Sequence, residues 1–93
     1  MITITRGESI FIDFKYATGV IPNGYYGTWE ILQNDAVIAN GTMNTSADQT
    51  TLELRIPSTT TQPLRGAYQL LVAVKNDTDG YCDYILEDTL NVK

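Results

Sequence analysis

The chain contains several short stretches in which apolar and polar residues alternate with a period of two. This period places alternate side chains on opposite faces of a β-strand. Helical spacing is absent over any useful length. The clearest alternating faces are Ile10, Ile12, Phe14 and Tyr16 near the start of the chain and Tyr68, Leu70, Val72 and Val74 near its end. The pattern predicts strands at residues 2–5, 9–16, 52–56, 68–74 and 84–92, with another around Trp29 and Ile31.

Turn-forming residues separate these predicted strands. Residues 6–8, Arg-Gly-Glu, predict a turn, and residues 17–27 are expected to form a loop before the tryptophan strand. Residues 33–35 are expected to turn into a short strand at 36–39. The dipeptide Asn40-Gly41 is a strong hairpin signal and predicts another turn, before residues 42–44.

The last third of the chain adds a connection, a hairpin and an irregularity. Pro57 is expected to end a strand because proline cannot donate a hydrogen bond to a neighbouring strand. Residues 57–66 are then a polar connection. Asp88 interrupts the alternation of the last strand, which predicts a β-bulge near residues 87–89.

Seven or eight short strands in 93 residues predict an all-β fold. We expect one domain, residues 1–93, folded as an antiparallel two-sheet immunoglobulin-like sandwich. In that arrangement Ile12 and Leu70 occupy the places where antibody domains carry their paired cysteines, and Trp29 packs between them. Tyr68 stands where such folds keep a corner tyrosine. A small barrel is the alternative.

Composition limits the chemistry that the chain can perform. There is no histidine and one cysteine, so no Ser/His/Asp or Cys/His arrangement and no internal disulfide can form. We therefore expect no enzyme activity and no cofactor. A net charge of −5, with six scattered basic residues, argues against nucleic-acid binding. No apolar run is long enough to span a bilayer, and the start lacks a secretory signal pattern, so we expect synthesis in the cytoplasm.

The densest group of chemically active residues is Asn-Asp-Thr-Asp-Gly-Tyr-Cys-Asp-Tyr at residues 76–84. Calcium held by Asp77, Asp79 and Asp83 is one interpretation. The acidic spacing of a helical calcium loop is missing, however, and Asp79 followed by glycine is a hairpin signal. We expect a turn with solvated acids and no metal site. Cys82, beside acidic neighbours, is expected to be inert and partly buried.

Two features predict binding surfaces. Tyr25 and Tyr26 lie together in a loop between glycines, which suits stacking on a sugar or a protein contact, although one of them could instead close the end of the sandwich. The second feature is a set of apolar residues whose strand neighbours already face the core. These residues are Leu32, Leu71, Ala73 and Ile85, and we expect them to form an interface on the outer face of one sheet.

Three segments resemble the immunoglobulin-like modules of tailed-phage virion proteins: ITRGESIFIDF, LRGAYQLLVAV and DTLNV. The resemblance is to the N-terminal domain of upper baseplate proteins from phages of Gram-positive bacteria. Those modules commonly open with arginine, glycine, an acidic residue and a hydroxyl residue, matched here by Arg6, Gly7, Glu8 and Ser9. The family's usual aspartate is Glu8 in this chain, and the middle of the chain carries no matching motif.

The resemblance implies a structural protein of the virion, either a capsid decoration or a tail or baseplate adaptor. It supplies no catalytic or cofactor-binding residues. The expected partners are other virion proteins or further copies of the chain, and not nucleic acid or membrane. The alternative is a carbohydrate-binding or cell-surface adhesive β-sandwich module in which Tyr25 and Tyr26 stack on a surface glycan.

Overall fold

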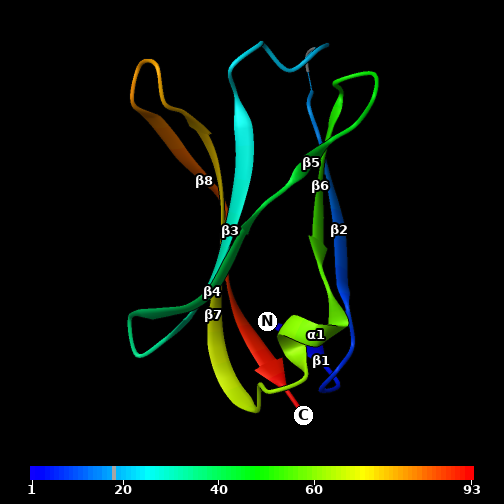
Figure 1. Ribbon diagram of the computed structural model, residues 1–93, viewed down its shortest axis with the longest axis vertical. Coiled ribbons are helices and arrows are strands. Elements are labelled where there is room, and N and C mark those ends of the chain that lie inside the picture. The colour runs from blue at the N-terminus through cyan, green and yellow to red at the C-terminus, as the bar shows by residue number, and fades with distance from the viewer. Residues whose placement is uncertain (18) are drawn as a thin grey trace.

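The computed structural model describes residues 1–17 and 19–93. In these residues it contains eight strands and one short helix (Figure 1). Thr18, in the expected loop at residues 17–27, lies outside the described residues. The elements in chain order are β1 (Ile2–Ile4), β2 (Ile10–Lys15), β3 (Tyr26–Gln33), β4 (Ala36–Thr42), β5 (Asn44–Thr45), β6 (Thr51–Ile56), α1 (Ser58–Thr61), β7 (Gly66–Asn76) and β8 (Tyr81–Val92).

The strands form two sheets. One has five strands in the order β1-β8-β7-β3-β4, and the other has three in the order β2-β6-β5. This confirms an all-β protein with two sheets. The expectation of antiparallel pairing needs one correction, because β1 pairs with β8 in parallel, with Ile2 opposite Leu90. The other strand pairs in the described residues are antiparallel.

Side chains from both sheets pack together in one cluster of buried residues. Trp29 on β3 is 5% exposed and Leu70 on β7 is fully buried, which confirms that both lie in the core. Ile12 on β2 is partly buried and packs against the same cluster. Its neighbour Phe11 points the other way and is 66% exposed, as the period of two requires.

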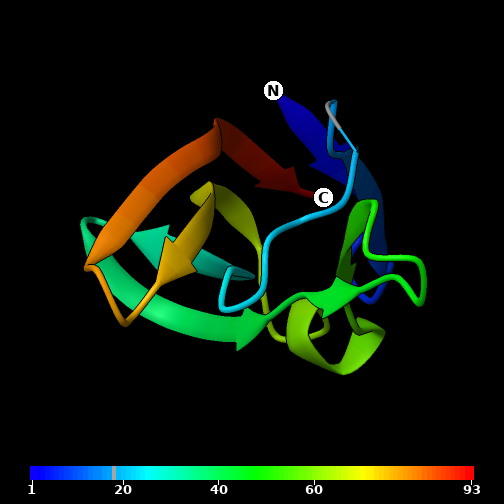
Figure 2. The same cartoon turned by 90° about the horizontal axis from the view of Figure 1, so that it is seen from above.

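The predicted turn at Asn40-Gly41 is wrong. Both residues lie inside β4, where Asn40 pairs with Glu30 and Gly41 pairs with Trp29. Figures 1 and 2 show that β4 continues into β5, so that the chain passes from the five-stranded to the three-stranded sheet. Glycine stands at position 41 because the indole ring of Trp29 occupies the space of a side chain there.

The predicted bulge is also displaced. The register between β7 and β8 shifts between Val72 and Ala73, which pair with Leu86 and Tyr84. Ile85 is therefore the extra residue, and residues 87–89 remain in regular register. Asp88 fits because it lies at the sheet edge, where its carboxylate pairs with the amino group of Met1 at 3.0 Å.

The polar connection after Pro57 contains the short helix α1 and closes one end of the molecule. The buried hydroxyl of Thr61 donates a hydrogen bond to the carbonyl oxygen of Glu8 at 2.8 Å, which attaches α1 to the predicted turn at residues 6–8. Tyr68, near the start of β7, anchors the end of this connection. Its hydroxyl donates to the carbonyl oxygen of Arg65 at 3.0 Å and accepts from the Arg65 N–H at 2.9 Å.

In the part of the chain that the structure describes, α1 is four residues long and no helix has the length and apolarity needed to cross a bilayer.

Candidate functional site

An apolar strip runs obliquely across the outer face of the five-stranded sheet. Leu32 is paired with Val37 across β3 and β4, and Ala73 is paired with Tyr84 across β7 and β8. Leu71 lies between these two pairs, diagonal to Leu32 and two residues before Ala73. Paired residues share one face of a sheet, and diagonal neighbours are within reach of long side chains. We call Val37, Leu32, Leu71, Ala73 and Tyr84 the outer strip.

Acidic residues border the centre of the outer strip. Leu71 has Glu30 opposite it on β3 and Glu87 opposite it on β8. Val37 and Tyr84, at the two ends of the strip, are 46% and 47% exposed. The surface is thus an apolar line with negative charge on both sides of its middle.

The structure places two of the predicted interface residues differently. Ala73 lies on the outer face but is only 3% exposed, because its side chain is small and lies between Thr28 and Tyr84. Ile85 does not lie on this face. As the extra residue of the bulge it turns instead toward a cleft at the end of the molecule. Leu32 and Leu71 are half-buried where they were expected.

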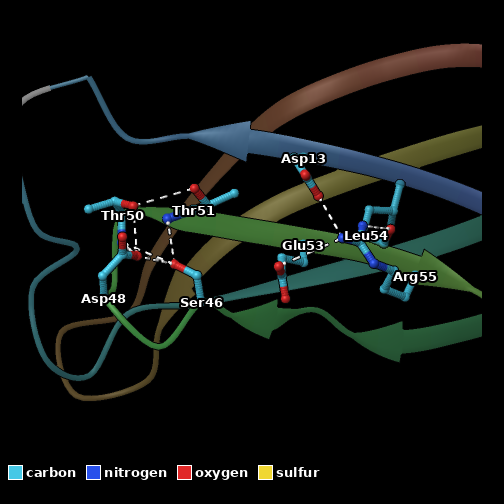
Figure 3. A network of polar contacts seen from close by, with 8 residues as sticks. All are labelled: Asp13, Ser46, Asp48, Thr50, Thr51, Glu53, Leu54 and Arg55. Atoms are coloured by element: carbon cyan, nitrogen blue, oxygen red, sulfur yellow. Dashed lines mark hydrogen bonds and ion pairs between the residues drawn. The ribbon is translucent and has the colours of Figure 1, made fainter.

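The outer face of the three-stranded sheet is chemically different, because its charges are paired with one another (Figure 3). Arg55 on β6 forms ion pairs with Asp13 at 2.8 Å and with Glu53 at 3.7 Å. Its guanidinium group also lies 4.8 Å from the ring centroid of Phe11, in a cation–π contact. Phe11 remains 66% exposed beside this guanidinium group, so this face carries a single exposed aromatic ring among paired charges, whereas the outer strip is a line of several apolar residues.

Figure 3 also shows how the turn between β5 and β6 is held. The Oδ1 atom of Asp48 accepts hydrogen bonds from the Ser46 hydroxyl at 2.7 Å and from the Thr50 hydroxyl at 2.8 Å. These bonds lower the pKa of Asp48 below its usual value of 3.8, and the bond from Ser46 has the largest effect. Asp48 therefore acts within the turn and is not directed at a ligand.

A cleft of about 340 Å³ opens at the end of the molecule opposite α1, between β2 and the β7–β8 hairpin. Phe14 and Tyr16 line one wall, and Tyr81, Asp83 and Ile85 of β8 line the other. At its base the ring of Tyr25 meets that of Tyr81 edge to face, with centroids 5.4 Å apart. The Asp83 carboxylate raises the pKa of Tyr81 above 10.0. The cleft is thus mainly apolar, with four aromatic residues, the Asp83 carboxylate on the β8 wall and Lys15 on the β2 wall.

Tyr25 and Tyr26 lie in different environments. Tyr25 packs against the core and lines the cleft. Tyr26 begins β3 and donates its hydroxyl hydrogen bond to Oδ1 of Asp77 at 2.7 Å, which raises the pKa of Tyr26 above 10.0. The two side chains therefore have different surroundings, Tyr25 in the cleft against the core and Tyr26 beside the β7–β8 turn.

The group of acids at residues 76–84 forms the predicted hairpin turn. Asn76 pairs with Tyr81, and Gly80 takes the positive φ of 74°. Asp79 accepts a hydrogen bond from the Tyr81 N–H, and Asp77 accepts one from Tyr26, so these two acids are not purely solvated as expected. Among residues 1–17 and 19–93, no three acidic or cysteine side chains gather as a metal-binding group. Cys82 is exposed, and not partly buried, because it lies across from Lys75 on the outer face.

The sequence interpretation did not find the cleft. Its lining residues come from four parts of the chain, at residues 14–16, at residues 21–25, at Leu52 on β6 and in the β7–β8 hairpin from Val74 to Ile85, and nothing in any one of these parts signals the others. Tyr16 gave a local signal, since it is an aromatic residue at the end of the strand predicted at residues 9–16, whereas Tyr81 was assigned to the predicted turn. No protein-family model matches this chain, and no curated protein matches it, so its function has to be argued from these two surfaces.

Proposed function

We propose that this chain is a non-enzymatic structural protein of a phage virion, a capsid decoration or a tail or baseplate adaptor. It binds other virion proteins, or further copies of itself, through the outer face of the five-stranded sheet. The observation that carries this proposal is the outer strip, an apolar line across that face. The resemblance of three segments to virion modules is the reason for proposing that the partners belong to a virion.

We also propose that the fold is immunoglobulin-like. If β2, β3, β6, β7 and β8 are the second, third, fifth, sixth and seventh strands of such a domain, β5 is the fourth and β4 is the additional strand of the variable type. The orders β8-β7-β3-β4 and β2-β6-β5 support this assignment, whereas β1 lies beside β8 and not beside β2. Tyr68 supports this assignment, because a corner tyrosine bonds to the backbone a few residues before it, as Tyr68 bonds to Arg65.

The outer strip supports a protein contact because of what surrounds it. Interfaces combine an apolar centre with a polar rim. Leu71 provides the centre and the carboxylates of Glu30 and Glu87 lie beside it, whereas the exposed aromatic ring of the opposite sheet, Phe11, stands among charged side chains and contacts Arg55. A surface that had nothing to bind would carry polar side chains at the positions of Leu32 and Leu71.

The test is the double variant Leu71→Lys with Tyr84→Lys. The tagged chain is expressed while the phage grows, and purified particles are probed for the tag. Sedimentation of the isolated chain measures self-association separately. We expect the variant to be lost from particles, or to sediment as a monomer where the parent is an oligomer, because two charges would have to be buried at the contact. Its melting temperature should change little, because both side chains point away from the core.

The matched control is Phe11→Lys, which puts the same charge on the outer face of the other sheet. This variant should assemble like the parent. Normal assembly of the Leu71→Lys, Tyr84→Lys variant would overturn the proposed contact surface. Absence of the unaltered chain from purified particles would overturn the virion role itself.

A further inference from the structure

Two asparagine–glycine dipeptides in this chain have opposite backbone environments. Asn23-Gly24 and Asn40-Gly41 are the two places where glycine follows asparagine. Both asparagine residues are exposed, so access to water does not distinguish them. The difference lies in the backbone of the glycine, and this matters because the glycine nitrogen is the atom that can react with the asparagine side chain.

This reaction converts asparagine to an acid and needs only water. The backbone nitrogen of the following residue loses its proton, attacks Cγ of the asparagine side chain and expels the side-chain amide as ammonia, which leaves a succinimide ring. Water then opens the ring at either carbonyl group and gives aspartate or isoaspartate. Glycine favours the reaction because it has no side chain to obstruct the attacking nitrogen and its backbone rotates freely.

The first dipeptide lies in a turn outside both sheets. The Tyr25 N–H donates to the carbonyl oxygen of Pro22 at 3.3 Å, so Asn23 and Gly24 are the two central residues of this turn. The bond that closes the turn does not involve the Gly24 N–H, and Gly24 is exposed, with a φ of 89°. Ring closure requires rotation about the bond between Cα and the carbonyl carbon of Asn23. In an exposed turn this rotation disturbs little else.

The second dipeptide is held inside β4. Gly41 pairs with Trp29 on β3. The Met43 N–H donates to the carbonyl oxygen of Gly27 at 2.8 Å, and hydrogen-bonded pairs recur at every second residue of an antiparallel ladder. The Gly41 N–H is therefore directed toward β3. The same rotation at Asn40 would break the pairing of β3 and β4 next to a core tryptophan.

We infer that Asn23 is a site of spontaneous deamidation in the folded chain, through a succinimide formed with the Gly24 nitrogen, and that pairing with β3 protects Asn40. Each event adds one carboxylate to a chain whose net charge is −5. Isoaspartate also adds one carbon atom to the main chain between Pro22 and Tyr25, and both of these residues line the cleft. The modification therefore changes the wall of the cleft. This inference does not rest on the outer-strip contact, because the two share no residue.

The test incubates the folded chain at mildly alkaline pH and compares it with the same chain unfolded in urea. Cleavage after Glu30, at mildly acidic pH, separates Asn23 from Asn40, and mass spectrometry measures the acid formed at each. In the folded chain, conversion at Asn23 should be about tenfold faster than at Asn40, or more, because opening a paired strand costs more free energy than opening an exposed turn. In urea the two should convert at similar rates.

Matched variants identify the source of the added charge. Asn23→Gln should prevent the more acidic form that appears on native ion exchange, because the larger ring that glutamine requires closes far more slowly. Asn40→Gln should leave that form unchanged. Fragments have to be mapped, because Asp79-Gly80 can form the same ring with no change in charge.

The inference is overturned if Asn23 keeps its amide in the folded chain over a period in which the unfolded chain has converted at both sites. It is also overturned if Asn40 converts as fast as Asn23 in the folded chain. The isoaspartate form, purified by ion exchange, should show a shifted amide NMR signal for Tyr25. An unshifted signal would overturn the effect on the cleft.

Discussion

The indole ring of Trp29 lies against the backbone of Gly41 and fills the place of a side chain there. A Cβ atom on Gly41 would lie 2.7 Å from Cε2, Cζ2 and Nε1 of Trp29. The two residues face each other across β3 and β4. Glycine at this position is therefore set by packing against a core residue twelve positions earlier in the chain, and not by a turn.

The variant Gly41→Ala should lower the free energy of unfolding by about 1–3 kcal/mol, because overpacking forces the indole ring or the strand to move. Urea unfolding measures this change. Asn40→Ala, at an exposed neighbour on the same strand, is the control and should stay within about 0.5 kcal/mol of the parent. Adding Trp29→Phe to Gly41→Ala should relieve part of the clash, so the two losses should be less than additive. A Gly41→Ala variant as stable as the parent would contradict the packing described here.

Gly41 illustrates why some elements could be predicted from the sequence and others could not. The buried faces of β2 and β7 could be predicted from the period of two alone. Burial on one side of a strand and solvent on the other require apolar and polar residues to alternate along the segment itself. The dipeptide Asn40-Gly41 also gives a local signal, which predicts a turn. This signal was misleading because Gly41 is needed for packing against Trp29, which lies on another strand.

The candidate surfaces also divide into features that the local sequence predicts and features that depend on distant residues. Leu32 and Leu71 were found because each alternates with core residues on its own strand. Ile85 was assigned to the wrong face because a bulge shifts the alternation by one residue, and the position of the bulge depends on the register with β7. The cleft depends on four separate parts of the chain meeting in space, so no single segment could reveal it.

Tyr68→Phe should destabilise the protein by about 1–3 kcal/mol. The change removes one hydroxyl that satisfies both the N–H and the carbonyl oxygen of Arg65, and leaves those partly buried groups without a partner. Thermal and urea unfolding measure the loss. Tyr84→Phe is the matched control, since that hydroxyl is on an exposed side chain, and it should be neutral. Equal stability of the two variants would show that the Arg65 bonds contribute little.

Truncation of the core should cost more than truncation of the surface. Leu70→Ala should lose about 2–5 kcal/mol and Trp29→Ala about 3–5 kcal/mol, from lost burial and an unfilled cavity. These losses approach the whole stability expected of a small domain, so either variant should be partly unfolded at 37 °C. Phe11→Ala removes an aromatic ring that is 66% exposed and should lose less than either. Parent-like melting of both core variants would rule out the register given for β3 and β7.

Asp48 should make the stability of the protein depend on pH at the acidic end. Hydrogen bonds from Ser46 and Thr50 hold its pKa below 3.8 in the folded state, whereas the unfolded chain has the ordinary value. A carboxylate with a lowered pKa stabilises the fold fully above its unfolded pKa, and this contribution is lost as the pH falls through the folded pKa. The difference in stability between the parent and Asp48→Asn should therefore be constant near neutral pH and disappear as the pH falls below 3.8. Carbon NMR of the Asp48 carboxyl group measures its titration directly. Ser46→Ala, which removes the first donor, should move that titration upward toward 3.8, and an unchanged midpoint would show that the Ser46 bond does not hold the charge.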